Sequence, residues 1–248
     1  MVSLLFTLIL VGLMMLTGRM QALENQVPER YWISLGGGIS LSYVFTTFLA
    51  ELSHRQEGVR PLGWPIVDYL FQHIHLVMLI GILCIYGLEW IARHHRTQAQ
   101  NLMPPSLYGI HLGFFSVYVL LVGYLLQHSP SQWFRCALLT LALGVHLSIT
   151  TRELWQYHPR RFQQQGRWLL SGSLLLGWFW GRMMLLPESL LTATIAFIAG
   201  VLMFQVLKHE LPERGGHFGA FLLGVVVNSG LLITVALIHH LEGIPVHP

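Results

Sequence analysis

The stretch LMFQVLKHELPER (202–214) decides the fold, because it runs from a long apolar segment directly into a cluster of charged residues. The residues from 188 to 201 that precede it are mostly apolar or small. A helix needs about 20 such residues to cross the hydrocarbon core of a bilayer. The stretch is therefore typical of the water-facing end of a transmembrane helix.

His209 and Glu210 in this stretch also match the start of the zinc-protease motif His-Glu-x-x-His, in which two imidazoles on one helix face hold the ion. Glu213 stands where the second histidine is needed, and Pro212 ends the helix just before that position. We therefore do not expect a protease site here, and we expect no enzymatic activity.

The whole chain of 248 residues has the same apolar character, with 54% hydrophobic and only 10% charged residues. Soluble domains carry about 25% charged residues. We predict an all-α integral membrane protein that forms one polytopic membrane domain over 1–248, with the lipid bilayer as its main partner and no nucleic-acid binding. The eight predicted transmembrane segments are 2–17, 31–52, 66–92, 106–127, 133–154, 168–186, 188–208 and 218–240.

The basic residues predict the orientation of these segments, because Lys and Arg concentrate in cytoplasmic loops. If the N-terminus is outside, the inner loops hold ten of the fourteen Lys and Arg residues. We therefore predict a multi-pass protein of the cell (inner) membrane with both termini outside. The ten inner residues are Arg19, Arg30, Arg93, Arg96, Arg152, Arg160, Arg161, Arg167, Lys208 and Arg214.

An internal repeat links the second and seventh segments, which run in opposite directions in this topology. Inverted repeats with a binding site near the bilayer midplane are common in secondary transporters. We predict repeat one over about 1–96, a central helix pair over about 104–156 and repeat two over about 167–242. YVFTTFLAELSHR (43–55) and LMFQVLKHELPER (202–214) share Phe45/Phe204, Glu51/Glu210, Leu52/Leu211 and Arg55/Arg214, each 159 positions apart (204 minus 45).

Several stretches resemble the ZIP family of divalent metal transporters. The second segment, with FLAELSH (48–54), and IGILCIYGLEWIARHHR (80–96) are similar to the second and third ZIP helices. IAFIAGVLMFQVLKHELPE (195–213) and HFGAFLLGVVVNSGLLI (217–233) look like the seventh and eighth. The resemblance implies eight helices, with helices 1–3 and 6–8 as an inverted repeat and both termini outside.

The same resemblance implies a metal site on the fourth and fifth helices. His111 and His146 match the first ligand of each ZIP motif, whereas Phe115 and Thr150 stand where the second ligand is usual. Glu153 follows His146 by about two helical turns and is the nearest carboxylate. We expect His111 and His146 at similar depth, roughly 9 Å and 12 Å from the inner edge. The alternative is that both are hydrogen-bonded core residues.

Other ionisable residues at membrane depth outline an expected ion path, because such groups are costly in a bilayer unless they serve a function. Histidine and carboxylate groups suit zinc and similar transition metals. The outer candidates are Glu51 and His73, and the inner candidates are Glu89, His94, His95, His209 and Glu210. In the eighth segment, Asn228 and Ser229 are expected to join helices by hydrogen bonds.

The leading hypothesis is a ZIP-like transporter of divalent metal cations, with degenerate site motifs and zinc or a similar metal as its substrate. No tightly bound cofactor is expected, and a homodimer is a possible assembly. One alternative is a ZIP-like membrane scaffold or interaction protein without transport. A weaker alternative is an intramembrane metal-dependent hydrolase.

Overall fold

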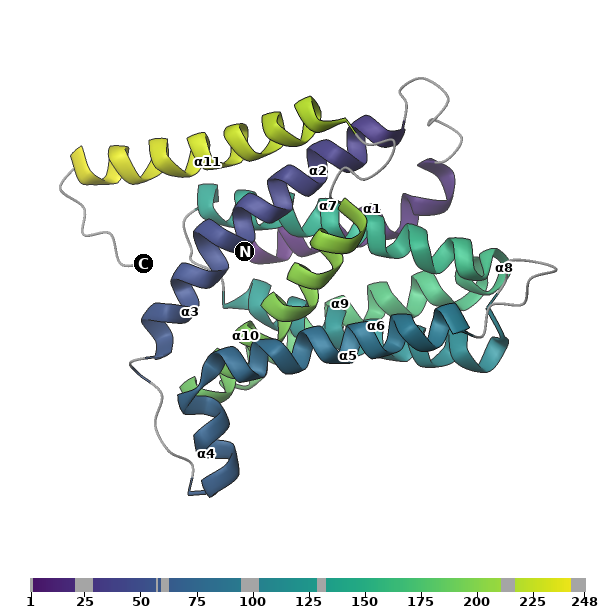
Figure 1. Cartoon of the computed structure of the whole chain (residues 1–248), viewed down its shortest axis with the longest axis horizontal. Helices are drawn as coiled ribbons and strands as arrows, with labels where there is room; N and C mark the ends of the chain where they lie inside the picture. The colour runs from purple at the N-terminus through teal and green to yellow at the C-terminus, as the bar shows by residue number, and fades with distance from the viewer. Residues whose placement is uncertain are drawn as a thin grey trace. The chain divides into compact units, whose positions relative to one another are not determined.

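The structure is a computed structural model that describes residues 2–20, 29–56, 58, 63–94, 103–128, 133–210 and 217–241. All regular secondary structure in these residues is helical (Figure 1). The helices are α1 (Val2–Met20), α2 (Glu29–Tyr43), α3 (Leu49–Gln56), α4 (Pro65–Gln72), α5 (Ile74–His94), α6 (Pro105–Gln127), α7 (Trp133–Tyr157), α8 (Pro159–Arg161), α9 (Arg167–Met183), α10 (Glu188–Gln205) and α11 (Phe218–Leu241), with π-helical segments η1 (Val44–Phe48), η2 (Phe162–Gly166) and η3 (Val206–Glu210).

The eight predicted segments lie largely within helix, although the segment 168–186 extends three residues beyond the end of α9 and one other segment is interrupted. The segment predicted over 66–92 is divided at His73, whose backbone dihedrals of −106° and 64° leave the helical region. The side chain of Gln56 donates a hydrogen bond to the carbonyl of Gln72 at 3.0 Å. This bond satisfies a carbonyl at the end of α4. Because the helix is broken at His73, α5 alone has the length of a membrane-spanning helix in this segment.

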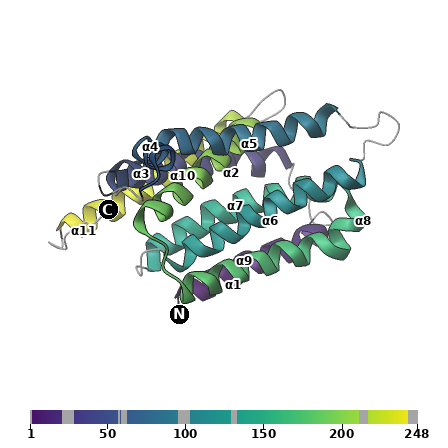
Figure 2. The same ribbon diagram turned by 90° about the horizontal axis from the view of Figure 1, so that it is seen from below.

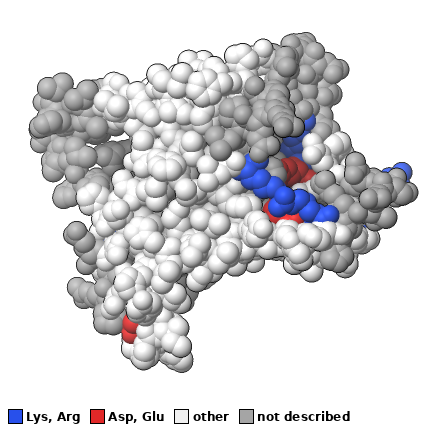
Figure 3. Space-filling view, viewed as in Figure 1, with Lys and Arg blue, Asp and Glu red and all other residues white. Residues whose placement is uncertain are grey.

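Among the described residues, four helical stretches are long and apolar enough to cross a membrane, namely Ile33–Gln56, Ile74–His94, Pro105–Gln127 and Glu188–Lys208. Two shorter apolar stretches, Val2–Leu16 and Phe218–Thr234, belong to α1 and α11. The described surface exposes many large apolar side chains, and Figure 3 shows few charged residues among them. Such a surface is unusual for a soluble protein and suits contact with lipid.

The chain divides into two compact units, each built from both halves of the sequence. Unit 1 comprises Met1–Gln26 and Ile80–Pro187, and unit 2 comprises Val27–Leu79 and Glu188–Pro248. The sequence of α5 passes from unit 2 into unit 1 between Leu79 and Ile80. The predicted repeat boundaries, at about 96, 104, 156 and 167, follow the sequence order and stay a prediction.

Unit 1 is built around a close crossing of α6 and α9, which lie side by side (Figure 2). A Cβ at Gly177 would lie 2.8 Å from the carbonyl carbon of Leu120, and one at Gly123 would lie 3.0 Å from the backbone nitrogen of Trp178. Only glycine therefore allows the two backbones to approach this closely. α1 packs against α7 and α9, and Ser3 bonds to both Gln127 (3.1 Å) and Trp178 (3.2 Å).

Unit 2 is built around a similar crossing of α2 and α11 (Figure 1). A Cβ at Gly38 would lie 2.9 Å from the backbone nitrogen of Val225. One turn further along α2, the Ser42 hydroxyl lies 2.7 Å from that of Ser229 and accepts a hydrogen bond from the Asn228 amide at 3.1 Å. The prediction that Asn228 and Ser229 join helices is confirmed.

The two stretches of the predicted repeat share a second feature in the structure. η1 lies within 43–55 and η3 begins within 202–214, so each stretch changes from α-helix to π-helix. π-helical turns are rare, and they occur mostly as single turns within α-helices. A third π-helical segment, η2, lies outside both stretches, so this feature does not single them out, and the repeat stays a prediction.

Candidate functional site

Two buried histidines of unit 1, His111 on α6 and His146 on α7, each lie beside a tyrosine ring of the other helix. His111 and His146 are each only 1% exposed. On α6, Phe115 and Tyr118 are buried on the same face as His111, four and seven residues after it. Burying an imidazole is costly unless hydrogen bonds compensate it. The surroundings of each ring therefore decide what it can bind.

His111 is held in one orientation by its own helix and by α7. Its Nδ1 lies 3.2 Å from the carbonyl oxygen of Leu107, and its ring lies edge-on to Tyr157 at 5.8 Å and 76°. A carbonyl oxygen only accepts, so Nδ1 must carry the proton in this bond. In the neutral ring, Nε2 then carries the lone pair in the ring plane. Metal-ligating histidines commonly show this arrangement, with the other nitrogen donating to a carbonyl.

His146 has an equivalent neighbour from the opposite helix. Its ring lies edge-on to that of Tyr118, with centroids 5.9 Å apart and an angle of 72°. Thr150, which occupies the position of an expected second ligand, donates its hydroxyl proton to the His146 carbonyl at 3.0 Å. The Thr150 oxygen retains lone pairs, but it brings no negative charge. Each helix thus supplies one histidine and one tyrosine to the facing surface.

The two histidine–tyrosine pairs lie at different heights along α6. Tyr118 follows His111 by seven residues (118 minus 111), which is roughly 10 Å of helix. Within the described residues, no three His, Cys, Asp or Glu side chains are grouped to hold a metal ion. The structure does not gather His111, His146 and Glu153 into a three-ligand group, and their role as metal ligands stays a prediction.

The position on α6 where the resemblance to ZIP motifs would imply a carboxylate is occupied by a buried aromatic side chain. Phe115, at that position, is 3% exposed and lies edge-on to Tyr118 at 6.4 Å and to Phe114 at 5.6 Å. Glu153 is half-buried on α7. A cation bound at His111 would therefore have neutral neighbours on α6, which weakens its binding.

The two candidates for the outer path both belong to unit 2. Glu51 forms an ion pair with Arg55 at 2.5 Å, one turn later on α3, which partly neutralises its carboxylate. His73 is exposed at the break between α4 and α5, with its ring 4.4 Å from that of Tyr69. Their part in an ion path stays a prediction.

The inner candidates are placed only in part. Glu89 is 2% exposed on the unit 1 part of α5. His94 is exposed at the end of this helix, where its ring lies 4.0 Å from Trp90 and its Nδ1 lies 3.0 Å from the Trp90 carbonyl. His209 and Glu210 belong to the backbone of η3, but their side chains, like all of His95, lie outside the described residues.

Sequence reasoning missed Tyr118 and Tyr157, the ring neighbours of the two histidines. Tyr118 follows His111 by seven residues and Tyr157 follows His146 by eleven, so the steps correspond to about two and three helical turns. Each tyrosine therefore shares a face with the histidine of its own helix. This spacing is a signal from which both could have been predicted.

Comparisons with protein families, curated proteins and solved structures found no match for this chain. The expected ZIP relationship therefore depends on the sequence stretches quoted above and on their resemblance to ZIP helices.

Proposed function

We propose that the protein is a ZIP-like membrane transporter of divalent transition-metal cations such as Zn²⁺. It would cross the membrane eight times with both termini outside. Unit 1 would carry the ion along the histidine–tyrosine surface between α6 and α7. Transport would be passive or ion-coupled, because the sequence contains no P-loop.

The observation that carries this proposal is the hydrogen bond between His111 Nδ1 and the Leu107 carbonyl. It leaves Nε2 as the basic nitrogen of a ring that is 1% exposed. A buried imidazole with this tautomer is prepared to bind a cation without losing a proton. His146 lies beside Tyr118, about two helical turns further along α6 than His111, and would provide a second imidazole along the same surface.

The shortage of carboxylates beside His111 and His146 is compatible with transport, and it lowers the expected affinity of this surface for the metal ion. Neutral imidazole, phenol and hydroxyl groups do not offset the charge of a divalent ion, so each binding step is weak. An ion path needs binding that is strong enough for entry and weak enough for release. We therefore expect low affinity for the substrate and modest selectivity among transition metals.

The test is metal uptake into proteoliposomes that contain a fluorescent metal indicator. The purified full-length chain is compared with a His111→Gln, His146→Gln double variant and with His75→Gln, which changes an exposed histidine on α5. We expect uptake of Zn²⁺ by the wild type and by His75→Gln, and only the rate of protein-free liposomes for the double variant. Background uptake of Zn²⁺, Mn²⁺ and Fe²⁺ by the wild type would contradict the proposal.

A second candidate function, a non-transporting membrane scaffold, is favoured by the packing of His111 against Tyr157 and of His146 against Tyr118. In a scaffold these rings would serve only to hold α6 to α7. The double variant would then lower the thermal stability of the protein, while metal uptake would be at background with or without the substitutions.

A further inference from the structure

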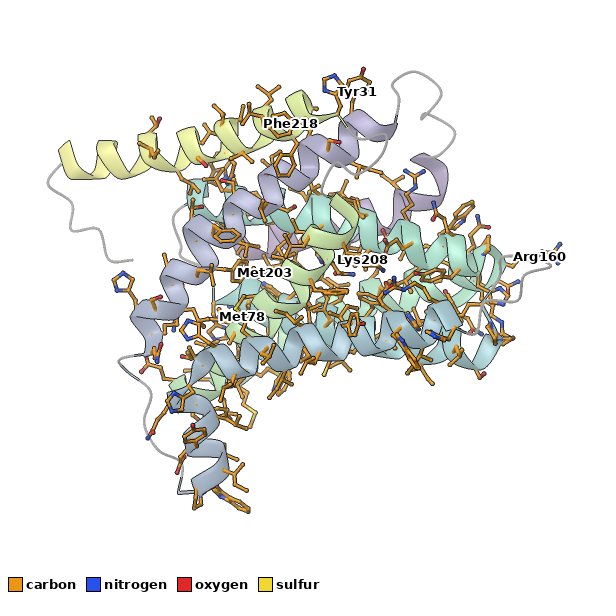
Figure 4. All side chains as sticks on the ribbon, viewed as in Figure 1. Tyr31, Met78, Arg160, Met203, Lys208 and Phe218 are labelled. Atoms are coloured by element: carbon orange, nitrogen blue, oxygen red, sulfur yellow. The ribbon has the colours of Figure 1, made fainter. Side chains whose placement is uncertain are left out.

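The corner of unit 1 where α7 is followed by α8 and η2 carries concentrated positive charge. Arg160 and Arg161 are exposed in α8, and Arg167 is half-buried at the start of α9. Arg160 points away from the end of the helix in Figure 4. The sequence from 154 to 187 contains no Asp or Glu, and Glu153 on α7 immediately precedes it. These arginines therefore have no carboxylate within their own stretch of chain.

Tyr108, near the start of α6, brings a buried hydroxyl group to the same corner. It is 2% exposed, and its ring lies edge-on to His158 at 5.5 Å. A Cβ at Gly166 would lie 2.9 Å from the Tyr108 hydroxyl, so this glycine lets the η2 backbone approach it. Arg161 follows His158, the ring neighbour of Tyr108, by three residues. The hydroxyl thus lies beside η2, the segment that separates Arg161 from Arg167 in the sequence.

Several buried hydrogen-bond donors of the described residues lie at this end of unit 1. Within the described part of the chain, no hydrogen-bond partner exists for the buried Tyr108 hydroxyl, Arg167 Nε or Trp155 Nε1. These groups come from α6, from α9 and from the end of α7. Leaving one buried donor unsatisfied costs about 1–3 kcal/mol. Donors combined with arginines form the chemical environment that binds an oxyanion.

Exposed aromatic and apolar side chains follow Arg167 at the start of α9. The Arg167 guanidinium lies 5.5 Å from the ring centroid of Trp168, which is 60% exposed. The next residue, Leu169, is also exposed. Exposed tryptophans lie preferentially at the membrane–water interface, and basic groups at the cytoplasmic surface attract anionic lipids. Arg152 on α7, together with Arg160, Arg161 and Arg167, makes four of the ten arginines and lysines expected on the inner side.

We propose that this corner binds the phosphate group of an anionic phospholipid, with Arg161 and Arg167 as cationic contacts and the Tyr108 hydroxyl as a buried donor. Trp168 would lie against the glycerol region beside the headgroup. The site is independent of metal transport, so its test can fail or succeed without bearing on the proposed function.

The test measures binding of phosphatidylglycerol and phosphatidylcholine to the purified full-length protein by native mass spectrometry, with inorganic phosphate as a third ligand. Variants are Tyr108→Phe and the double variant Arg161→Gln, Arg167→Gln. Tyr108→Phe keeps the ring beside His158 and removes only the donor. The matched controls are Tyr86→Phe and Arg182→Gln, which change an exposed tyrosine on α5 and an exposed arginine near the opposite end of α9.

We expect tighter binding of phosphatidylglycerol than of phosphatidylcholine. Loss of a charge-assisted hydrogen bond should weaken phosphatidylglycerol binding about tenfold in each variant, and the two controls should match the wild type. Equal binding of both lipids, or an Arg182→Gln effect as large as that of the arginine double variant, would overturn the site. Inorganic phosphate that binds as tightly as phosphatidylglycerol in a Tyr108-dependent way would overturn the assignment to a lipid.

Discussion

The α6–α9 crossing of unit 1 and the α2–α11 crossing of unit 2 share one pattern of small residues but differ in polar bonding. Small residues recur at every fourth position, as Ser173, Gly177 and Gly181 on α9 and as Ser34, Gly38 and Ser42 on α2. In unit 2 the last of them, Ser42, bonds to Ser229 and Asn228 on the facing helix. In unit 1 the last is Gly181, and beyond it the Tyr124 hydroxyl of α6 bonds only to backbone groups after α9, those of Met184 (3.3 Å) and Leu186 (2.9 Å).

This difference shows how each unit divides its polar groups between packing and chemistry. In lipid, helices associate through close backbone packing at small residues and through interhelical hydrogen bonds. Unit 2 uses its buried Ser42 and Asn228 for helix pairing. Unit 1 pairs α6 with α9 at glycines, and its buried His111 and His146 lie on the α6 and α7 surfaces instead.

The largest effect is expected from Gly177→Ala in unit 1. The new Cβ would meet backbone atoms of Leu120, which cannot rotate away as a side chain would. α9 also packs against α1, so separation of α6 and α9 would disturb three helices. We expect a loss of about 2–3 kcal/mol in the free energy of unfolding, at the upper end for overpacking. Unfolding in mixed micelles, followed by circular dichroism, measures it.

The matched control for this substitution is Gly172→Ala on the same helix, where a Cβ would meet no atom within 4 Å. Alanine is the better helix former, so this control should be neutral or slightly stabilising. Equal destabilisation by both variants would show that the crossing does not depend on glycine at Gly177.

A smaller effect is expected from Gly38→Ala in unit 2. The Cβ would meet the backbone of Phe221 and Val225, but α11 packs mainly against α2. The hydrogen bonds at Ser42 can also hold the pair one turn away. We expect a loss of about 1–2 kcal/mol, measured in the same unfolding assay. Gly230→Ala, at an open position on α11, is the control, and a loss larger than that of Gly177→Ala would reverse the comparison.

The smallest effects on the free energy of unfolding are expected from removing the serine hydrogen bonds at each crossing. Ser42→Ala removes two interhelical contacts of unit 2, and we expect it to cost about 1 kcal/mol. Ser3→Ala removes the bonds of Ser3 to Gln127 and Trp178 in unit 1. Ser3 is the second residue of α1, and at this end of the helix water can replace the lost bonds. We expect about half that cost. Unfolding free energies that rank Ser3→Ala above Ser42→Ala would contradict the division of roles described above.

The sequence predicts the helices well because continuous apolar runs have few alternatives in a bilayer. It did not predict the break at His73, since no proline or glycine marks it and the break is stabilised by Gln56 from another helix. The pairing of α6 with α9 was not predicted either. Hydropathy carries no information about partners, although the small-residue spacing around Gly177 is a usable signal.

For the candidate site, the burial of His111 and His146 followed from their positions within apolar segments. Their ring neighbours did not, because Tyr118 and Tyr157 were assigned no role from the sequence. Whether two imidazoles share one ion depends on the relative rotation and height of α6 and α7. Spacing along one helix cannot determine that geometry, and the expected depths of His111 and His146 did not reveal the separate tyrosine contacts.

The most direct test of the proposed role of unit 1 is zinc X-ray absorption spectroscopy on the Zn²⁺-loaded full-length protein in lipid. We predict nitrogen and oxygen ligands at about 2.0–2.1 Å with imidazole scattering in the wild type, and loss of the imidazole signal in the His111→Gln, His146→Gln variant. An imidazole signal that persists in the double variant, or a wild-type spectrum with water ligands alone, would contradict the assignment of these two histidines as metal ligands.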